Sequence, residues 1–406
     1  MNFIPNFELP FFVSLLLLLV LARIFGEIME RFKQPAMIGE ILAGIILGPS
    51  ILNFIHRTED LKVISDLGVF LLVIIAGLEI NFDDILKSLR GKNIVISLLA
   101  FFLPILSGFF VGVSFDQDVL TTVFIGLCVA ITALPVSVRI LMDLGKLNSK
   151  IGQKIVSVAV FDDVIALTIL GILLDLKDVE KTFTIVTNTV LYTALKLAFF
   201  MLIIALTYRV IKKLSNKENF IENQLNTILN YLKGKESLFA VFFVFILIFA
   251  SITESIGLHF IIGAFFASMF ITKDLVGEKH LETFHNTTNS MAMGFLTPIF
   301  FAGIGLEFQF SSIENYGLLT AIIIVSFLSK ILGGFIGGKI VGYSNGFSFA
   351  MGIGLNARGI MELVIANIAY KSGIINIEIF SMLVIMGLIT TISTPLLLKQ
   401  ALKKVE

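Results

Sequence analysis

The chain has 406 residues, of which 57% are hydrophobic and 15% are charged, and its formal net charge at pH 7 is zero. Soluble domains typically contain roughly 25% charged residues, so this composition excludes an ordinary water-soluble protein. A neutral chain also offers no electrostatic basis for binding nucleic acid. The single cysteine, Cys128, excludes an intramolecular disulfide framework and a cysteine metal cluster.

Apolar stretches of about 20 residues, the length that crosses a bilayer, recur along the whole sequence. They predict an all-α polytopic membrane protein, a single transmembrane unit over residues 1–406 with about thirteen transmembrane helices. The first stretch is long and is preceded by an acidic residue, so we expect a true span and not a signal peptide. The expected spans are 9–30, 36–56, 62–80, 92–114, 119–143, 150–174, 183–214, 237–256, 257–273, 291–309, 317–342, 345–371 and 376–399.

The longest polar connection, residues 215–236, divides the chain into a first half (1–214, spans one to seven) and a second half (237–406, spans eight to thirteen). If the N-terminus lies outside, the inner loops contain roughly three times as many lysines and arginines as the outer loops, or more. Since inner loops normally carry this excess, we expect a multi-pass protein of the cell (inner) membrane with its N-terminus outside. The C-terminus and the linker at 215–236 are then cytoplasmic.

Related segments in the two halves indicate an internal repeat. Gly77–Phe82 ends the third span and Gly305–Phe310, a similar segment 228 residues later, ends the tenth. At a similar offset Ile38-Gly39 matches Ile262-Gly263, and Gly126 matches Gly354. The matched spans are seven apart, an odd number, so the halves have opposite orientations. Inverted repeats of this kind are typical of secondary transporters, whose binding sites lie at the repeat interface.

Two adjacent carboxylates, Asp162 and Asp163, lie in the middle of the apolar span 150–174. One charge at the bilayer centre costs roughly 2.5–3.5 kcal/mol on insertion scales, and like charges in contact disfavour each other's ionisation. A pair this costly at mid-membrane indicates a functional ion or proton site.

Two further spans carry signs of a broken helix. Pro135 lies within the fifth span, close to Thr132, and the segment Gly352–Gly359 of the twelfth span contains Arg358. Because proline and glycine interrupt helices, we expect two discontinuous helices whose ends meet near the membrane centre, where exposed carbonyls bind cations. The alternative is an ordinary proline kink and a glycine packing face.

Other charges occur within or at the ends of spans. Lys330 lies in the middle of the eleventh span and needs an acidic partner, for which Asp162 or Asp163 is the obvious choice; a purely structural ion pair is the alternative. Glu362 follows Arg358 by four residues, the spacing of a local pair on one helix. Glu79, near the end of the third span, is expected to line a vestibule.

Several segments together resemble the monovalent cation:proton antiporter-2 superfamily, and the resemblance covers essentially the whole chain. The segments that carry it are Gln34–Gly44 with Leu47–Pro49, Ala76–Glu79, Ile131–Leu141, Phe161–Asp163 and Asn356–Gly359.

The resemblance implies a core domain with crossed broken helices at spans 5 and 12, a dimer domain, a homodimer and elevator-like alternating access. Members with paired aspartates resemble electrogenic sodium/proton antiporters, which serve pH homeostasis. The resemblance makes Asp163 the Na⁺-binding carboxylate and Asp162 the partner of Lys330. We expect backbone carbonyls and Thr132 to help bind the cation. Relatives with Gln-Asp here carry a nucleotide-binding domain and electroneutral relatives have Asn-Asp, so we expect neither property.

The sequence therefore predicts exchange of Na⁺ or Li⁺ for H⁺, with no resident cofactor and no enzymatic activity. A K⁺/H⁺ or broad monovalent cation/H⁺ antiporter on the same fold is the first alternative, because nothing in the sequence sets the cavity size. An intramembrane aspartyl protease is disfavoured, since its two aspartates must face each other from different helices. A channel is disfavoured by the buried lysine and the inverted broken helices.

Overall fold

The computed structural model describes residues 9–56, 58–79, 93–147, 149–176, 183–215 and 235–403. Within these ranges every regular element is helical, and no strand occurs. Most of the linker predicted at 215–236 lies outside the described residues. The main helices are α1 (Phe11–Arg31), α2 (Ala36–Leu47), α3 (Glu59–Leu78), α5 (Asn93–Ser114), α6 (Val119–Ala130), α7 (Leu134–Asp143), α8 (Lys150–Leu176), α9 (Phe183–Ser215), α11 (Lys235–Ser255), α12 (Phe260–Ser268), α13 (Lys273–Val276), α14 (Glu278–Met291), α15 (Thr297–Glu307), α16 (Tyr316–Val341), α17 (Asn345–Gly354), α18 (Ile360–Lys371) and α19 (Ile377–Leu402).

The prediction of a polytopic all-α membrane protein is confirmed. In the described ranges, nine helices are long and apolar enough to cross a membrane, and α2 and α6 are shorter apolar helices. The predicted count of about thirteen spans is not established, because several expected spans are divided. The polar stretch between the expected spans 257–273 and 291–309 contains the helix α14, in which Phe284 and Thr288 are spaced four residues apart and are buried on one side.

Side-chain caps fix where several helices begin. The carboxylate of Asp118 accepts hydrogen bonds from two amides at the start of α6. Asn315, Ser344 and Asn376 cap α16, α17 and α19 in the same way. Each cap satisfies backbone donors that have no partner within the helix, which is worth about 1 kcal/mol in water.

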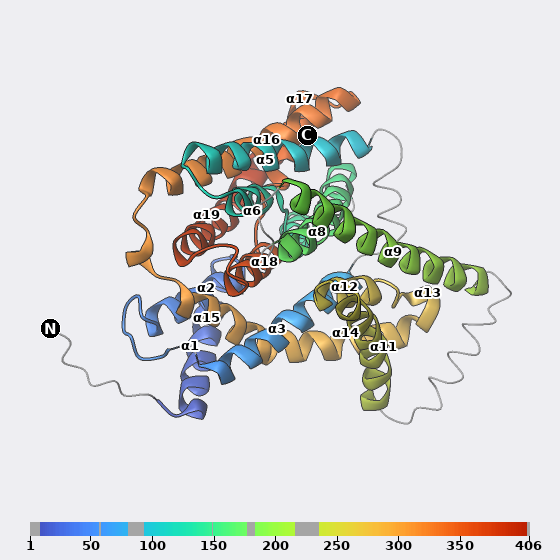
Figure 1. Ribbon diagram of the computed structural model, residues 1–406, viewed down its shortest axis with the longest axis horizontal. Helices are drawn as coiled ribbons and strands as arrows, with labels where there is room; N and C mark the ends of the chain where they lie inside the picture. Colours follow the sequence, from blue (N-terminus) through green and yellow to red (C-terminus); the bar gives the residue numbers. More distant parts are fainter. Residues whose placement is uncertain are drawn as a thin grey trace. The chain divides into compact units, whose positions relative to one another are not determined.

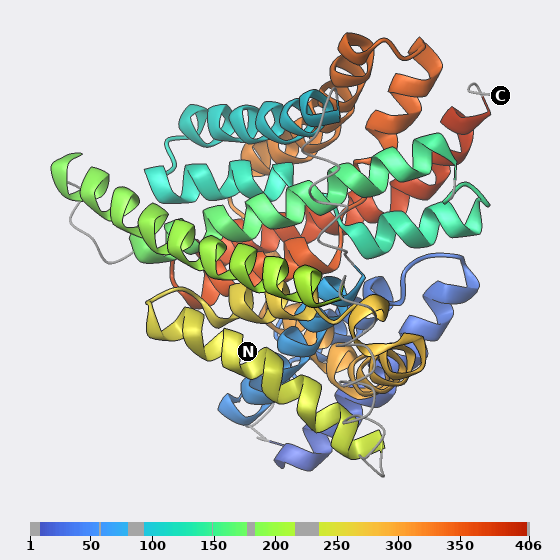
Figure 2. The same ribbon diagram turned by 90° about the vertical axis from the view of Figure 1, so that its right-hand side faces the viewer.

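The chain forms two compact units. The first unit comprises residues 1–69, 86–166 and 295–406, so it combines parts of both halves of the sequence. In it, α5 lies along α16, and these two helices also pack against α6 and α17 respectively (Figures 1 and 2). Helices α1, α2 and α15 form a second group, while α18 packs on α19.

The second unit comprises residues 70–85 and 167–294, with α9 and α11–α14 as its main helices. Phenylalanine rings fill much of it; Phe242 and Phe284, for example, lie 5.0 Å apart between ring centroids. The end of α8 is joined to α9 by the ion pair of Asp175 with Lys196, at 3.2 Å between Oδ2 and Nζ. These contacts connect neighbouring helices within the unit.

Matching close contacts support the internal repeat. A Cβ atom at Gly126 would lie 2.5 Å from the carbonyl oxygen of Ile105, and a Cβ atom at Gly352 would lie 2.4 Å from that of Ile331. Gly352 follows Gly126 by 226 residues, and Ile331 follows Ile105 by the same number. These contacts therefore match Gly126 with Gly352, two residues from the Gly354 that the sequence suggested. Only glycine permits helices to approach this closely.

Candidate functional site

Two interrupted helices cross in the first unit, as the sequence predicted. One interruption separates α6 from α7 at residues 131–133, and the other separates α17 from α18 at residues 355–359. The amide of Ala133 donates a hydrogen bond of 2.8 Å to the carbonyl oxygen of Ala357. The two extended segments are therefore bonded to each other directly, which fixes the crossing point of the repeats.

Pro135 explains why the first interruption is stable. It is the second residue of α7, where the missing N–H costs no hydrogen bond within the helix. The residue before α7, Ala133, has extended dihedral angles of φ −77° and ψ 104°. Proline therefore acts here as the start of a new helix and not as a kink within one.

Asp162 and Lys330 form a fully buried ion pair next to this crossing. Both side chains have 0% relative exposure, and the Lys330 ammonium donates to Asp162 Oδ2 at 2.7 Å. The same ammonium also donates to the carbonyl oxygen of Ala130, the last residue of α6. The structure brings the central lysine and Asp162 into contact, and the lysine also binds a broken-helix end.

Asp163 is the next residue of α8 and is 1% exposed. It directly follows the aspartate that Lys330 contacts, within the same buried turn of α8. The two carboxylates and one ammonium thus form one buried charge cluster, in which a small cation or a proton would reduce the net negative charge.

Thr132, in the first interruption, links the two repeats. Its hydroxyl lies 2.7 Å from Asp162 Oδ2 and 3.0 Å from the carbonyl oxygen of Leu355. A hydroxyl has one proton to donate, so only one of these two acceptors receives it at a time. Thr132 therefore connects the aspartate on α8 with the end of α17.

Arg358 contacts the backbone of the other repeat. Its guanidinium donates to the carbonyl oxygens of Cys128, at 2.7 Å, Val129 and Ile131. The four-residue spacing suggested a local pair with Glu362, but no hydrogen bond joins the two: neither oxygen of the Glu362 carboxylate has a hydrogen-bond partner within the described residues.

The exposed carbonyls at the end of α6 were expected to bind a transported cation. Instead, the carbonyl oxygens at positions 128 to 131 all accept hydrogen bonds from Arg358 or Lys330. The last carbonyls of a helix need such partners, and the helix dipole favours cations there. Sequence reasoning missed this role of Arg358. The available signal was an arginine within one broken span and a second broken span whose carbonyl oxygens need donors.

Glu362 and Glu79, both predicted to support the site, belong to different units of the structure. Glu362 is fully buried in the first turn of α18, and an added Cβ atom at Gly387 of α19 would lie 3.7 Å from both of its carboxylate oxygens. Glu79 directly follows α3 in the second unit and is exposed. Its predicted role in a vestibule stays a prediction.

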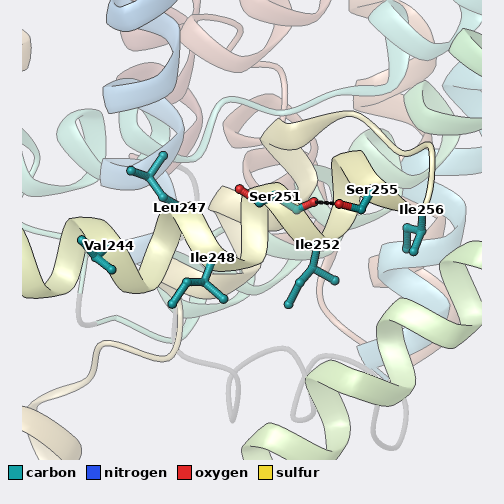
Figure 3. Close-up of a pocket in the computed structure, with 7 residues that line it drawn as sticks. All are labelled: Val244, Leu247, Ile248, Ser251, Ile252, Ser255 and Ile256. Atoms are coloured by element: carbon teal, nitrogen blue, oxygen red, sulfur yellow. Dashed lines mark hydrogen bonds between the residues drawn. The ribbon is translucent and has the colours of Figure 1, made fainter.

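A shallow hollow of about 470 Å³ occurs on α11 in the second unit (Figure 3). Its lining side chains are apolar except for two serines, and Ser255 donates to the backbone carbonyl of Ser251 at 2.7 Å. None of the lining residues is titratable, so this hollow offers no ion or proton chemistry. The lining residues are Val244, Leu247, Ile248, Ser251, Ile252, Ser255 and Ile256.

A buried charge cluster at the crossing of two interrupted helices from repeated halves is typical of ion-coupled secondary transporters. The family described as "Sodium/hydrogen exchanger, transmembrane" matches residues 15–404. The chain therefore belongs to the sodium/hydrogen exchanger family. The resemblance to monovalent cation:proton antiporters is confirmed, and the family consists of transporters and not of enzymes.

Individual relatives are similar to this chain over nearly their whole lengths. A Na⁺/H⁺ antiporter of Enterococcus hirae is 30% identical, with 97% of this chain and 99% of that protein covered. The Na⁺/H⁺-K⁺ antiporter GerN of Bacillus cereus is 28% identical, with 97% and 96% covered. The solved structure of the sodium proton antiporter MjNhaP1 from Methanocaldococcus jannaschii has the same fold, with a TM-score of 0.68, 16% identity, and 96% and 95% of the chains covered.

Proposed function

We propose that this protein exchanges Na⁺ or Li⁺ for protons across the membrane. Membership in the exchanger family supports the exchange of a monovalent cation for protons. The observation that carries the assignment to particular residues is the buried pair of Lys330 and Asp162 beside Asp163. A cluster with two carboxylates and one ammonium is one charge short of neutrality, and either a cation or a proton supplies that charge.

In the proposed mechanism, Asp163 binds the cation, and Asp162 and Thr132 help to hold it. Protons and Na⁺ compete for the two carboxylates. When Na⁺ binds, it displaces protons and releases Lys330 from Asp162, since the cation then compensates the carboxylate charge. Coupled groups of this kind release protons in macroscopic steps that belong to the whole cluster.

The proposed movement is alternating access of the elevator type. An empty cluster keeps an uncompensated charge and is costly to carry through an apolar barrier, whereas a loaded cluster is less costly. Pro135 and Arg358 support the site by keeping the interrupted helices in register. Glu79 is proposed to line the vestibule through which cations reach the site.

We further propose that exchange is electrogenic, because the chain has the Asp-Asp sequence at positions 162 and 163. If so, a membrane potential imposed with K⁺ and valinomycin drives Na⁺ flux in proteoliposomes. Indifference to the potential would instead indicate one-for-one exchange.

K⁺/H⁺ or broad monovalent cation/H⁺ exchange is the second candidate function. It is favoured by the B. cereus relative, whose name includes K⁺. Dequenching assays with Na⁺, Li⁺ and K⁺ on the same proteoliposomes separate the two candidates. Strong responses to Na⁺ and Li⁺ with little response to K⁺ support the first.

The remaining proposals concern the setting of the protein. We propose a homodimer in the cell (inner) membrane with the N-terminus outside, acting in pH homeostasis. Cysteine labelling of single-cysteine variants near each terminus, in intact cells and inverted vesicles, tests the orientation. The mass of the detergent-solubilised protein tests the dimer.

The decisive experiment on the site uses Asp163→Asn in proteoliposomes with a ΔpH. This change keeps the size of the side chain but removes its charge, and we expect it to abolish ΔpH-driven Na⁺ flux. Glu378→Gln, in which a glutamate that binds backbone amides at the start of α16 is changed, is the control and should retain flux. Full Na⁺ flux with Asp163→Asn would refute the assignment.

A further inference from the structure

The crossing contains one more buried carboxylate than the proposed exchange uses. Among the described residues, five charged side chains are at most 1% exposed: Asp162, Asp163, Glu362, Lys330 and Arg358. If all are ionised, the three carboxylates outnumber the two cations by one, and the set has a net charge of −1. All five belong to the first unit and surround the crossing of the interrupted helices.

Glu362 differs from Asp162, Lys330 and Arg358 in its hydrogen bonding. Asp162 accepts from Lys330 and Thr132, and Arg358 donates to three carbonyls. Neither oxygen of Glu362 has a hydrogen-bond partner within the described residues. A buried ionised carboxylate without hydrogen-bond partners is costly, so a proton on Glu362 would remove a costly charge from this set.

The surroundings of Glu362 allow it to act on the rest of the cluster. Arg358 precedes Glu362 by four residues and donates to the carbonyl oxygen of Cys128 on α6. The charged groups near enough to act on Glu362 are Arg358 and Lys330, and the nearby titratable group on α6 is the Cys128 thiol. The facing residue on α19 is Gly387, which brings no charge and leaves room beside the carboxylate. At this depth charges interact over several ångströms with little screening.

We propose that Glu362 is a third carboxyl group of the transport site, whose protonation opposes cation binding through charge and not through coordination. This inference rests on the proposed cation/proton exchange. With Glu362 ionised, one bound Na⁺ brings the set to zero net charge. With a proton on Glu362, the set is already neutral, and Na⁺ makes it +1, which is unfavourable in a buried site. Acidification therefore weakens cation binding through a residue that does not touch the cation.

The alternative role is structural, because a carboxylate in the first turn of a helix favours the positive end of the helix dipole. The two roles differ in one measurable respect. A structural carboxylate affects stability and the amount of folded protein, whereas a charge-coupled carboxyl changes how the apparent Na⁺ affinity depends on pH.

The first variant is Glu362→Gln, which keeps the shape of the side chain and imitates its protonated form. We expect a Na⁺ affinity at alkaline pH that is about tenfold or more weaker than in the wild type, because one favourable charge is lost. We also expect the apparent Na⁺ affinity to depend less steeply on pH, because one competing proton is lost. The affinity then changes about tenfold less per pH unit. Glu362→Asp should restore the steep dependence, and Glu378→Gln should match the wild type.

The second variant, Gly387→Ala, leaves every charge in place. The added methyl group would lie 3.7 Å from both Glu362 oxygens, an ordinary contact distance, so the protein should fold. An apolar group here makes the ionised carboxylate less favourable. The loss of Na⁺ affinity on acidification should therefore begin at a higher pH, by about half a unit or more.

Both variants are compared with the wild type by the apparent KM for Na⁺ in proteoliposomes between pH 6 and 9. Na⁺-dependent thermal stabilisation of the purified protein gives a second reading that does not need transport. If the wild type lacks Na⁺/H⁺ exchange, the proposed function fails. If the wild type exchanges normally and both Glu362→Gln and Gly387→Ala keep its pH dependence, the inference about Glu362 is overturned. If Glu362→Gln does not fold, the result with Gly387→Ala decides.

Discussion

The ammonium of Lys330, on α16, lies 2.7 Å from the carboxylate of Asp162, on α8, and both side chains are completely buried. The same ammonium donates to the carbonyl oxygen of Ala130 at the end of α6. One side chain therefore neutralises a carboxylate and caps an interrupted helix. Any event that separates Lys330 from Asp162 also alters the contact at the interruption, which couples the charge of the site to the backbone around it.

The first prediction concerns this ion pair. Lys330→Ala leaves a buried aspartate without its counter-ion, and breaking a buried pair in this way typically costs about 3–5 kcal/mol. We expect a clearly lower melting temperature in detergent at pH 8. Because a proton on Asp162 removes the uncompensated charge, the deficit relative to the wild type should shrink at acidic pH.

The control for this prediction is the double variant Asp162→Asn, Lys330→Gln, which removes both charges together. It should be more stable than Lys330→Ala alone, since no uncompensated charge remains at the pair. A Lys330→Ala variant as stable as the wild type at pH 8 would show that the pair does not hold Asp162 in its charged form.

The second prediction concerns Arg358, which donates to the carbonyl oxygens of Cys128, Val129 and Ile131. Lysine keeps the charge but lacks the planar fork of donors that reaches three carbonyls at once. Arg358→Lys should therefore lower the free energy of unfolding by about 2 kcal/mol or more, since hydrogen bonds to charged groups contribute about 1.5–3 kcal/mol each. Thermal unfolding of the purified variant checks this; unchanged stability would mean that a single ammonium satisfies the end of α6.

Lys330 and Arg358 also show which contacts could be predicted from the sequence and which could not. A lysine in the middle of an apolar span needs a buried carboxylate, and the adjacent aspartates were the obvious partners, so the pair with Lys330 could be predicted. The spacing of Arg358 and Glu362 instead suggested a local pair, but the structure forms no hydrogen bond between them. Spacing along a helix cannot show that the arginine precedes the first turn of α18 and that four carbonyls of another helix need donors.

The interruptions themselves could be predicted, because Pro135 and the glycines after Gly352 weaken helices at corresponding positions of the two halves. The register between the two repeats could not be predicted. The match of Gly126 with Gly352 depends on which helices touch, and this is determined by packing between segments distant in the sequence. The helical state of α14 was missed for a similar reason, since a polar helix with only two buried residues resembles a loop.

The third prediction tests the close packing of the repeats. Gly126→Ala and Gly352→Ala would each place a Cβ atom within 2.5 Å of a backbone carbonyl oxygen, and no side-chain rotation relieves that clash. Overpacking of this kind typically costs about 1–3 kcal/mol. Gly294→Ala is the matched control, because no atom lies within 4 Å of a Cβ atom at that position. Melting temperatures should fall for the first two variants and stay near the wild type for the control.

Equal losses of stability at Gly126 and Gly352 would also indicate that the two glycines have equivalent packing roles in the two repeats. Similar losses in all three variants, including Gly294→Ala, would indicate instead that alanine disturbs these helices for reasons other than close approach.

The last prediction concerns the hydroxyl of Thr132, which has Asp162 Oδ2 and the Leu355 carbonyl oxygen as its two acceptors. Thr132→Val keeps the shape but removes the donor, so Asp162 loses one of its two hydrogen-bond donors in this site, at a cost of about 1–3 kcal/mol. Thr132→Ser keeps the hydroxyl. We expect Thr132→Val to reduce the initial rate of ΔpH-driven Na⁺ flux about tenfold or more, because 1.4 kcal/mol corresponds to a factor of ten.

Thr132→Ser should retain most of the flux, and the comparison at equal amounts of folded protein separates the hydroxyl from the methyl group. If Thr132 holds the cation as proposed, the apparent KM for Na⁺ rises in Thr132→Val as well. If the hydroxyl serves only to bond α17 to the first interruption, the melting temperature falls while the KM for Na⁺ stays at the wild-type value. In that outcome Thr132 is removed from the proposed ion ligands, and Asp162 and Asp163 remain.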